Sequence, residues 1–113
     1  MKEIKALIQP SKLYDVVMAL HRIPSMPGFI TSDIRGFPRG HADPESQSHG
    51  IDAIDSFEMM KVECVVPDSL APLVVETIAR VARTGYSRDG RIIISAVEDA
   101  VKIRTGQHGE EAV

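Results

Sequence analysis

Four segments of the chain carry the alternation or the residue types that predict β-strands. In residues 2 to 9, Ile4, Ala6 and Ile8 fall on one side of an extended chain, and Pro10 ends the run. Residues 29 to 37 are rich in β-branched and aromatic types, and "FEMMKVECVV" alternates again. The last segment, "RIIISAV", is apolar on both faces, which favours a strand at the centre of a sheet.

Two stretches between these segments repeat apolar residues at the spacing of one helix face. The first predicts a helix over about residues 12 to 22, capped by Ser11. Its apolar face consists of Leu13, Val16, Val17, Leu20 and Ile23. The second predicts a helix that Asp68 or Ser69 caps and that Gly85 stops in a left-handed conformation. Its buried stripe consists of Leu70, Val74, Ile78 and Val81.

The predicted element order, β-α-β-β-α-β, is that of the α+β ferredoxin-like plait, an antiparallel sheet with two helices on one face. At 113 residues the chain is expected to form a single domain, residues 1–113. The other face of such a sheet is bare. Because the last strand is apolar on both faces, we expect other subunits to cover the bare face.

The connection between the second and third strands, residues 38 to 56, shows no period and is rich in polar and turn-forming residues. A connection of this length inside a compact domain is typically functional or disordered. The tail from Gly106 onward is also polar, and we expect it to fray.

Composition narrows the partners and the compartment. A net charge of −3 and an aromatic content of 4%, with no tryptophan, disfavour a nucleic-acid-binding surface. The single cysteine, Cys64, excludes an intramolecular disulfide and suits a reducing compartment. It lies on the inward side of its strand, which predicts a core residue rather than a nucleophile. Because Met1 leads directly into charged and apolar residues without a signal peptide, we predict a cytoplasmic protein.

Two basic segments near the C-terminus suggest an anion site. In "TGYSRDGRIIIS", residues 84 to 95, two glycines allow a loop whose backbone N–H groups form an anion nest beside Arg88 and Arg91. In "KIRTG", Lys102 and Arg104 are two residues apart, so both project from the same side of an extended chain. Taken alone, each segment is more typical of a helix stop or a solvated face.

Several motifs together resemble those of the PII signal-transduction proteins. In chain order they are "GFPRGH" at 36 to 41, "VVPD" at 65 to 68, "TGYSRDGRIII" at 84 to 94 and "IRTG" at 103 to 106. The similarity begins at Met1 and covers essentially the whole chain. It implies a homotrimer that binds ATP or ADP in the clefts between its subunits. It also implies a T-loop at about residues 38–57, a basal loop at about 83–91 and a C-terminal loop at about 102–108.

The resemblance further implies a sensor that is not an enzyme. It also implies that the T-loop docks on a target transporter or enzyme, so that any membrane contact would be indirect. Carried over position by position, the implied nucleotide-binding residues are Ile8, Gly28, Phe29, Gly36, Phe37, Arg39, Glu63, Val65, Arg88, Asp89, Gly90, Arg91, Lys102 and Arg104.

The chain departs from the family pattern at positions that matter for a second ligand. Gly40 stands where the family has a glutamine that helps hold Mg²⁺ and 2-oxoglutarate, and Met59 stands where it has a lysine. Arg88 replaces a glycine, which adds a charge and removes backbone freedom. No tyrosine lies between Arg39 and Lys61 to accept a uridylyl group. These departures argue against ordinary 2-oxoglutarate sensing and leave the role of Mg²⁺ open.

Two alternatives to the nucleotide sensor stay open at this point. His41 and His49, with the loop acids Asp43, Glu45 and Asp52, are of the types that bind divalent metals, so a metal-responsive module is the second hypothesis. Their spacing matches no recognised metal signature. ATP hydrolysis is the third and weakest hypothesis, because no general base is paired with a nucleophile.

Overall fold

The structure is a computed structural model that describes residues 1–39 and 56–113. The strands are β1 (Lys2–Ile8), β2 (Phe29–Gly36), β3 (Phe57–Val66) and β4 (Arg91–Ala96). The helices are α1 (Leu13–His21) and α3 (Ala71–Ala82), with short 3-10 helices η1 (Pro10–Lys12) and η3 (Gly109–Ala112). Each predicted strand and helix is present.

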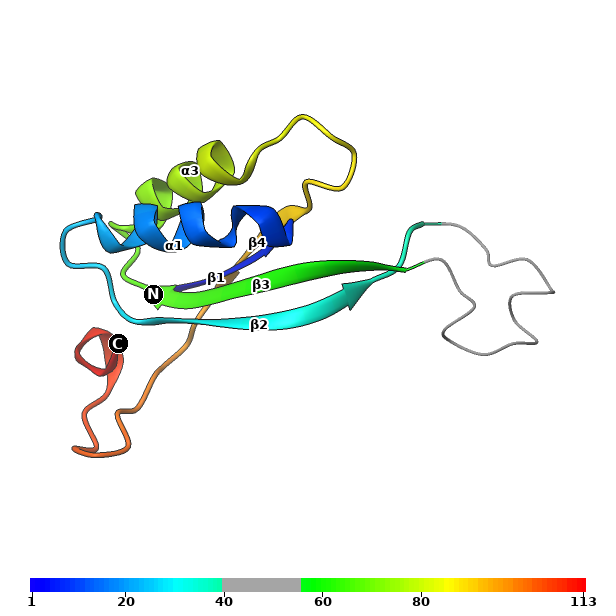
Figure 1. Ribbon diagram of the computed structural model, residues 1–113. Coiled ribbons are helices and arrows are strands. Elements are labelled where there is room, and N and C mark those ends of the chain that lie inside the picture. Colours follow the sequence, from blue (N-terminus) through cyan, green and yellow to red (C-terminus); the bar gives the residue numbers. More distant parts are fainter. Residues whose placement is uncertain (40–55) are drawn as a thin grey trace, which may run out of the picture.

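The four strands pair into one antiparallel sheet in the order β2-β3-β1-β4, and both helices lie on the same face of it (Figure 1). β3 lies between β2 and β1, and α1 packs beside α3. This arrangement of the described segments confirms the α+β ferredoxin-like plait.

The core lies between the sheet and the two helices. Ile4, Ala6 and Ile8 of β1 are fully buried, as their alternation predicts. The helix side chains buried against them are Val16, Leu20, Val74 and Ile78. Leu13, Leu70 and Val81 are partly buried at the margin of this cluster. The predicted apolar stripes therefore face the sheet.

Both predicted helix caps are wrong. Ser11 lies inside η1, and α1 begins after Lys12 with no side-chain cap. α3 begins after Leu70, also without one. Asp68 instead forms an ion pair of 3.0 Å with the α-ammonium group of Met1, and this partner holds the pKa of Asp68 below its usual value.

Gly85 does not stop α3. Its φ of +90° is the predicted left-handed conformation. The helix, however, already ends at Ala82, because Arg83 turns to an extended conformation. Gly85 therefore shapes the loop that follows the helix.

β4 is an edge strand, not a central one. Of its apolar side chains, Ile93 on the bare face is 43% exposed and Ile94 on the helix side is 51% exposed. A run that is apolar on both faces suits a central strand, yet in the single chain both faces of β4 remain partly open to solvent. The exposed apolar side chains of β4 are therefore available for contact with another subunit.

The C-terminal tail is folded rather than frayed. An antiparallel bridge joins Val101 to His108, and η3 follows directly. Within this hairpin, Lys102 N–H donates to the carbonyl of Gln107 at 2.9 Å. The tail is polar because it is a solvent-exposed hairpin held by its own hydrogen bonds.

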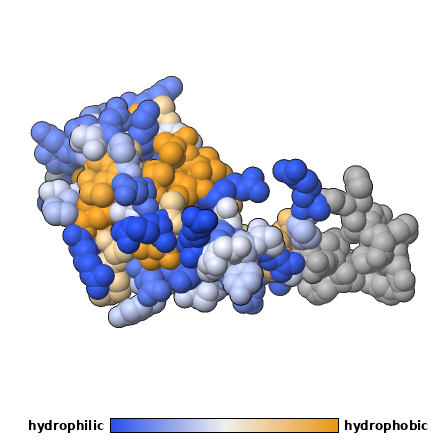
Figure 2. All heavy atoms as spheres, turned by 90° about the horizontal axis from the view of Figure 1, so that it is seen from above, coloured by the Kyte–Doolittle hydropathy of each residue, from blue (hydrophilic) through white to orange (hydrophobic). Residues whose placement is uncertain are grey.

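The helix side of the molecule shows hydrophobic patches broken by hydrophilic side chains (Figure 2). Exposed Leu73 on α3 contributes to this surface. Within residues 1–39 and 56–113, no helix has both the length and the apolar character needed to cross a membrane.

Candidate functional site

The basal loop between α3 and β4 is organised by the carboxylate of Asp89. Its Oδ2 accepts hydrogen bonds from the backbone N–H groups of Thr84 and Gly85, at 2.9 and 2.8 Å. Its Oδ1 accepts hydrogen bonds from the Thr84 hydroxyl and, at 3.0 Å, from Nε2 of Gln9 at the end of β1. The Thr84 hydroxyl is the main cause of a lowered pKa of Asp89, followed by the two backbone donors and Gln9. Asp89 therefore stays ionised and ties the loop to the sheet.

This network changes the prediction of an open anion nest. The N–H groups of Thr84 and Gly85 point at the loop's own carboxylate, so they are already satisfied. The side chains of Arg88 and Arg91, which are both exposed, offer positive charge to an external anion. The role of Asp89 is accordingly to shape the loop.

Gly90 brings the basal loop into direct contact with β1. Its φ is +88°, and a Cβ atom there would lie 1.7 Å from the carbonyl oxygen of Leu7 and 2.9 Å from the Met59 methyl carbon. Only glycine fits this position. Next to it, a hollow of about 270 Å³ is lined partly by Ile8 and Arg91.

The position expected to be a lysine in the family is occupied by an apolar side chain. Met59 is 7% exposed and its methyl group lies toward Gly90. A buried thioether offers no positive charge to a ligand carboxylate. The prediction that this chain lacks the cation is consistent with how Met59 packs.

The root of the T-loop lies beside the basal loop. Gly36 and Phe57 form the last pair of the β2–β3 ladder, and a Cβ atom on Gly36 would lie 2.5 Å from the Phe57 ring. The Arg88 guanidinium carbon lies 4.5 Å from the centroid of that ring. Phe37 and Arg39 follow on the exposed chain. Six of the predicted residues are thus gathered at this end of the sheet around the loop and root, namely Gly36, Phe37, Arg88, Asp89, Gly90 and Arg91.

A second hollow lies at the opposite end of the sheet. It has a volume of about 440 Å³, and the predicted residues Gly28, Phe29, Glu63 and Val65 line it together with the C-terminal Val113. The Phe29 ring packs against the core and lies 5.2 Å from the ring of His21, centroid to centroid. Glu63 forms an ion pair of 3.2 Å with Lys61.

Lys102 and Arg104 lie in a tight turn, so the prediction that an extended chain aligns them is wrong. The turn is closed by the Gly106 N–H, which donates to the Lys102 carbonyl at 2.7 Å. Between the two cations, the Ile103 side chain is fully exposed. The hairpin therefore presents two cations and one uncovered apolar side chain.

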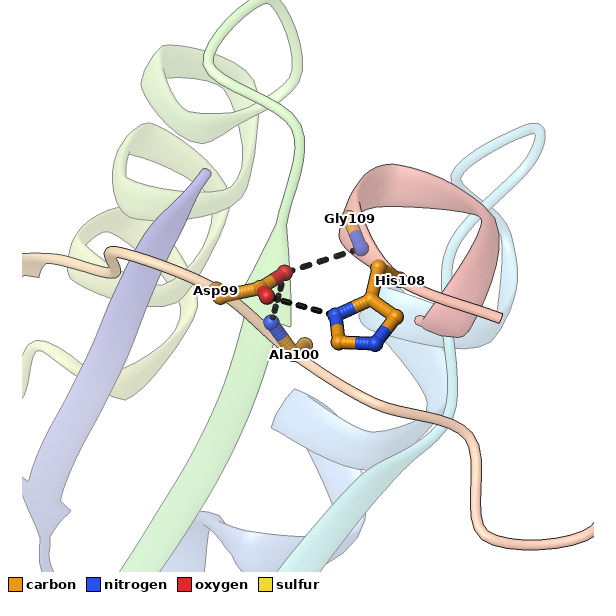
Figure 3. Close-up of polar contacts among 4 residues, drawn as sticks. All are labelled: Asp99, Ala100, His108 and Gly109. Carbon is orange, nitrogen blue, oxygen red and sulfur yellow. Dashed lines mark hydrogen bonds and ion pairs between the residues drawn. The ribbon is translucent and has the colours of Figure 1, made fainter. Parts of the chain in front are cut away.

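A second aspartate closes the base of this hairpin (Figure 3). Asp99 Oδ1 accepts hydrogen bonds from the N–H groups of Ala100 at 2.8 Å and Gly109 at 3.1 Å, and Oδ2 pairs with His108 Nδ1 at 2.7 Å. The hydrogen bond from His108 is the main cause of a lowered pKa of Asp99. This clasp joins the two arms of the hairpin.

The predicted nucleotide-binding residues therefore form two groups in one chain. Phe57 and Val65 mark the two ends along β3, and a strand of that length separates them by about 26 Å. The C-terminal hairpin also leaves β4 at the end away from the basal loop (Figure 1). We call the group formed by Gly36, Phe37, Arg88, Asp89, Gly90 and Arg91 the basal half-site. The group formed by Gly28, Phe29, Glu63, Val65, Lys102 and Arg104 is the hairpin half-site.

The remaining predictions concern a metal and a thiol. His41, His49 and Gly40 lie outside the described residues. Within the described part of the chain, no three His, Cys, Asp or Glu side chains are grouped to hold a metal ion. Cys64 is buried, and burial raises its pKa to about 11, so the thiol stays protonated as expected of a core residue.

Sequence reasoning missed four residues that shape the two half-sites, namely Gln9, Thr84, Asp99 and His108. Gln9 and Thr84 hold Asp89, and His108 closes on Asp99. Thr84 and Asp89 are only five residues apart in a glycine-containing loop, which is a usable turn signal. Gln9 is 80 residues from Asp89, and no local pattern reveals that contact.

The fold and the two half-sites define a ferredoxin-like α+β protein with cationic loops at both ends of its sheet. Comparison with known proteins identifies the family. The family described as "Nitrogen regulatory protein P-II" matches residues 1–107. A curated protein of that name from Microchaete diplosiphon is 40% identical to this chain, and those from Haemophilus influenzae and Rhodospirillum rubrum are 38% and 36% identical. Each of the three alignments covers 100% of both chains.

The chain belongs to the nitrogen regulatory protein P-II family. Members of this family are signalling proteins rather than enzymes, and they typically form trimers. The resemblance inferred from the motifs is thereby confirmed.

Proposed function

We propose that this protein is a cytoplasmic sensor that binds ATP or ADP in the clefts of a homotrimer and regulates a transporter or enzyme through its T-loop. Membership of a signalling family supports the general role. The nucleotide proposal rests mainly on the separation of the two half-sites within one chain, because their cations can surround one polyphosphate only if two chains contribute them.

The distance between the two half-sites within one chain favours a site shared between subunits. The six residues of β4 alone span about 17 Å, and the hairpin continues away from the basal loop (Figure 1). Lys102 and Arg104 therefore cannot join Arg88 and Arg91 around one polyphosphate unless they come from a second chain. The adenine end would lie against the hollow of the hairpin half-site, beside Val65.

The exposed apolar surface supports the same assembly. Ile30 on β2 and Ile93 on β4 are 65% and 43% exposed on the bare face of the sheet, and Ile103 at the hairpin tip is fully exposed. A trimer that packs its bare faces together and seats each hairpin on a neighbour covers all three.

Nucleotide binding is tested by calorimetric titration with ATP, ADP and AMP. We expect ATP and ADP to bind the wild type and Arg104→Ala to weaken both at least tenfold, because a charge-assisted phosphate contact is lost. Arg80→Ala on α3 is the matched control, since it removes an exposed arginine outside both half-sites. No binding by the wild type, or equal binding by Arg104→Ala, would contradict the proposal.

A mixing experiment tests whether each site is shared. Arg91→Ala damages the basal half-site and Arg104→Ala the hairpin half-site, so neither homotrimer contains an intact site. After unfolding and refolding an equal mixture, random assembly restores about one quarter of the sites, because each needs one intact half from each of two chains. If both halves came from the same chain, mixing would restore none.

A further inference from the structure

The ring of Phe57 closes the end of the β2–β3 ladder, where the chain enters the T-loop. It occupies the space that the missing side chain of Gly36 leaves open, since a Cβ atom there would lie 2.5 Å from the ring. Gly36 and Phe57 are the last paired residues of the two strands. A contact that holds the Phe57 ring in place therefore also stabilises the last β2–β3 pair.

The Arg88 guanidinium covers this ring. Its central carbon lies 4.5 Å from the ring centroid, within the range of a cation–π interaction. Arg88 belongs to the basal loop, and the adjacent Asp89 is fixed by hydrogen bonds from Thr84, Gly85 and Gln9. Because the backbone beside it is anchored, the long side chain of Arg88 is the part that can change position.

A polyphosphate would compete with the ring for this cation. A guanidinium forms paired, charge-assisted hydrogen bonds to phosphate oxygens, and these are stronger than a cation–π contact at a partly exposed ring. Arg88 is exposed and lies in the basal half-site with Arg91. A phosphate chain bound there would thus draw Arg88 away from Phe57.

From this geometry we infer that Arg88 couples phosphate occupancy to the root of the T-loop. Without nucleotide its guanidinium stacks on Phe57 and keeps the last β2–β3 pair closed. With ATP bound it leaves the ring, and the ladder end loosens. The inference rests on the proposed nucleotide site and adds to it a specific route of regulation.

Phe57 is the residue to change, because it contacts Arg88 but belongs to neither half-site. Phe57→Leu keeps an apolar side chain and removes the π face, whereas Phe57→Tyr keeps the ring and is the matched control. Two quantities are measured for each protein, namely the affinity for ATP and AMP by calorimetry, and amide hydrogen exchange at residues 34–36 and 57–59 with and without ATP.

We expect ATP to speed exchange at these amides about two- to fivefold in the wild type and in Phe57→Tyr. AMP, which lacks the polyphosphate, should change it less. In Phe57→Leu, exchange should be fast already without nucleotide and should not respond to ATP. This variant should also bind ATP about two- to fivefold more tightly, because no ring contact is given up on binding.

The outcomes separate this inference from the proposed function. If the wild type binds no ATP, the proposed function fails and the coupling fails with it. If ATP binds but Phe57→Leu shows wild-type affinity and a wild-type exchange response, only the coupling is overturned. Slower exchange at the ladder end on ATP binding to the wild type would overturn it equally.

Discussion

Two loops at opposite ends of β4 are each organised by one aspartate, yet they differ in what the aspartate reaches. In the basal loop, Asp89 accepts a hydrogen bond from Gln9, 80 residues away on the chain. In the C-terminal hairpin, Asp99 bonds to Ala100, His108 and Gly109, all within ten residues of it in the chain. A contact distant in sequence thus ties the basal loop to the end of β1, whereas contacts within the hairpin hold the hairpin together.

This difference matches the parts that the two loops would play in a shared site. A loop that is tied to β1 holds the backbone that carries Arg88 and Arg91 at a fixed place on its own subunit. A hairpin that keeps its internal shape can carry Lys102 and Arg104 to a neighbouring subunit as one unit. A shared site benefits when each loop keeps its own shape, because its cations are then already positioned for the phosphates. It also benefits when the two loops can move relative to each other as a ligand enters.

The strongest way to break the basal loop is Gly90→Ala. The added Cβ would collide with the Leu7 carbonyl of β1, in addition to the strain of a positive φ. We expect a loss of unfolding free energy on the order of 3 kcal/mol or more, measured by urea denaturation. Gly106→Ala in the hairpin is the matched control, because its φ is +75° with nothing within 4 Å, so only about 1 kcal/mol of local strain is expected. Equal losses would contradict the proposed difference between the loops.

The next largest effect is expected from exchanging the two carboxylates for amides. Asp89→Asn places an NH₂ group among the donors of Thr84, Gly85 and Gln9, so one of these partly buried or exposed donors loses its acceptor. The melting temperature should fall, and amides of both the basal loop and the end of β1 should exchange faster. Asp99→Asn should speed exchange only in the hairpin. A fall in melting temperature as large for Asp99→Asn as for Asp89→Asn would count against the comparison.

How far sequence could predict this molecule depends on the range of the interactions involved. The alternation of Ile4, Ala6 and Ile8 predicts a strand and its buried face correctly, because side-chain direction in a strand is a local property. The apolar run of β4, by contrast, predicts a central strand, and this prediction is wrong. The apolar composition of β4 indicates that both of its faces are buried by other side chains. It does not indicate whether those side chains belong to this chain or to another subunit.

The site was predicted as a set of residues but not as an arrangement. Motif resemblance pointed to Asp89 and Gly90, and both lie at the centre of the basal loop. Their roles depend on contacts with Gln9 and Leu7 of β1, which no spacing within the loop encodes. The division into two half-sites likewise follows from strand register and from the length of β3, and these appear only once the sheet is assembled.

Acid should weaken both loops, but only the loss of the Asp89 contacts should lower global stability. Both Asp89 and Asp99 have folded-state pKa values below the ordinary value of 3.8. A lowered carboxyl pKa contributes stability that is fully present above the unfolded pKa and is lost as the pH falls through the folded pKa. We expect global stability to drop in this acid range because of Asp89, and the drop to be smaller in Asp89→Asn. In Asp99→Asn the acid dependence of global unfolding should match that of the wild type.

The smallest effect is expected from His108, because it supplies only one of the three hydrogen bonds that Asp99 accepts. His108→Ala removes the donor of the 2.7 Å contact, so the pKa of Asp99 should rise toward its ordinary value and the Gly109 amide should exchange faster. Global melting should not change, since both partners are exposed. His108→Asn is the matched control, because its amide nitrogen can donate from nearly the position of Nδ1 and should restore part of the Asp99 shift. NMR titration of the Asp99 carboxyl carbon measures that shift, and a wild-type pKa in His108→Ala would show that the backbone donors alone hold the clasp.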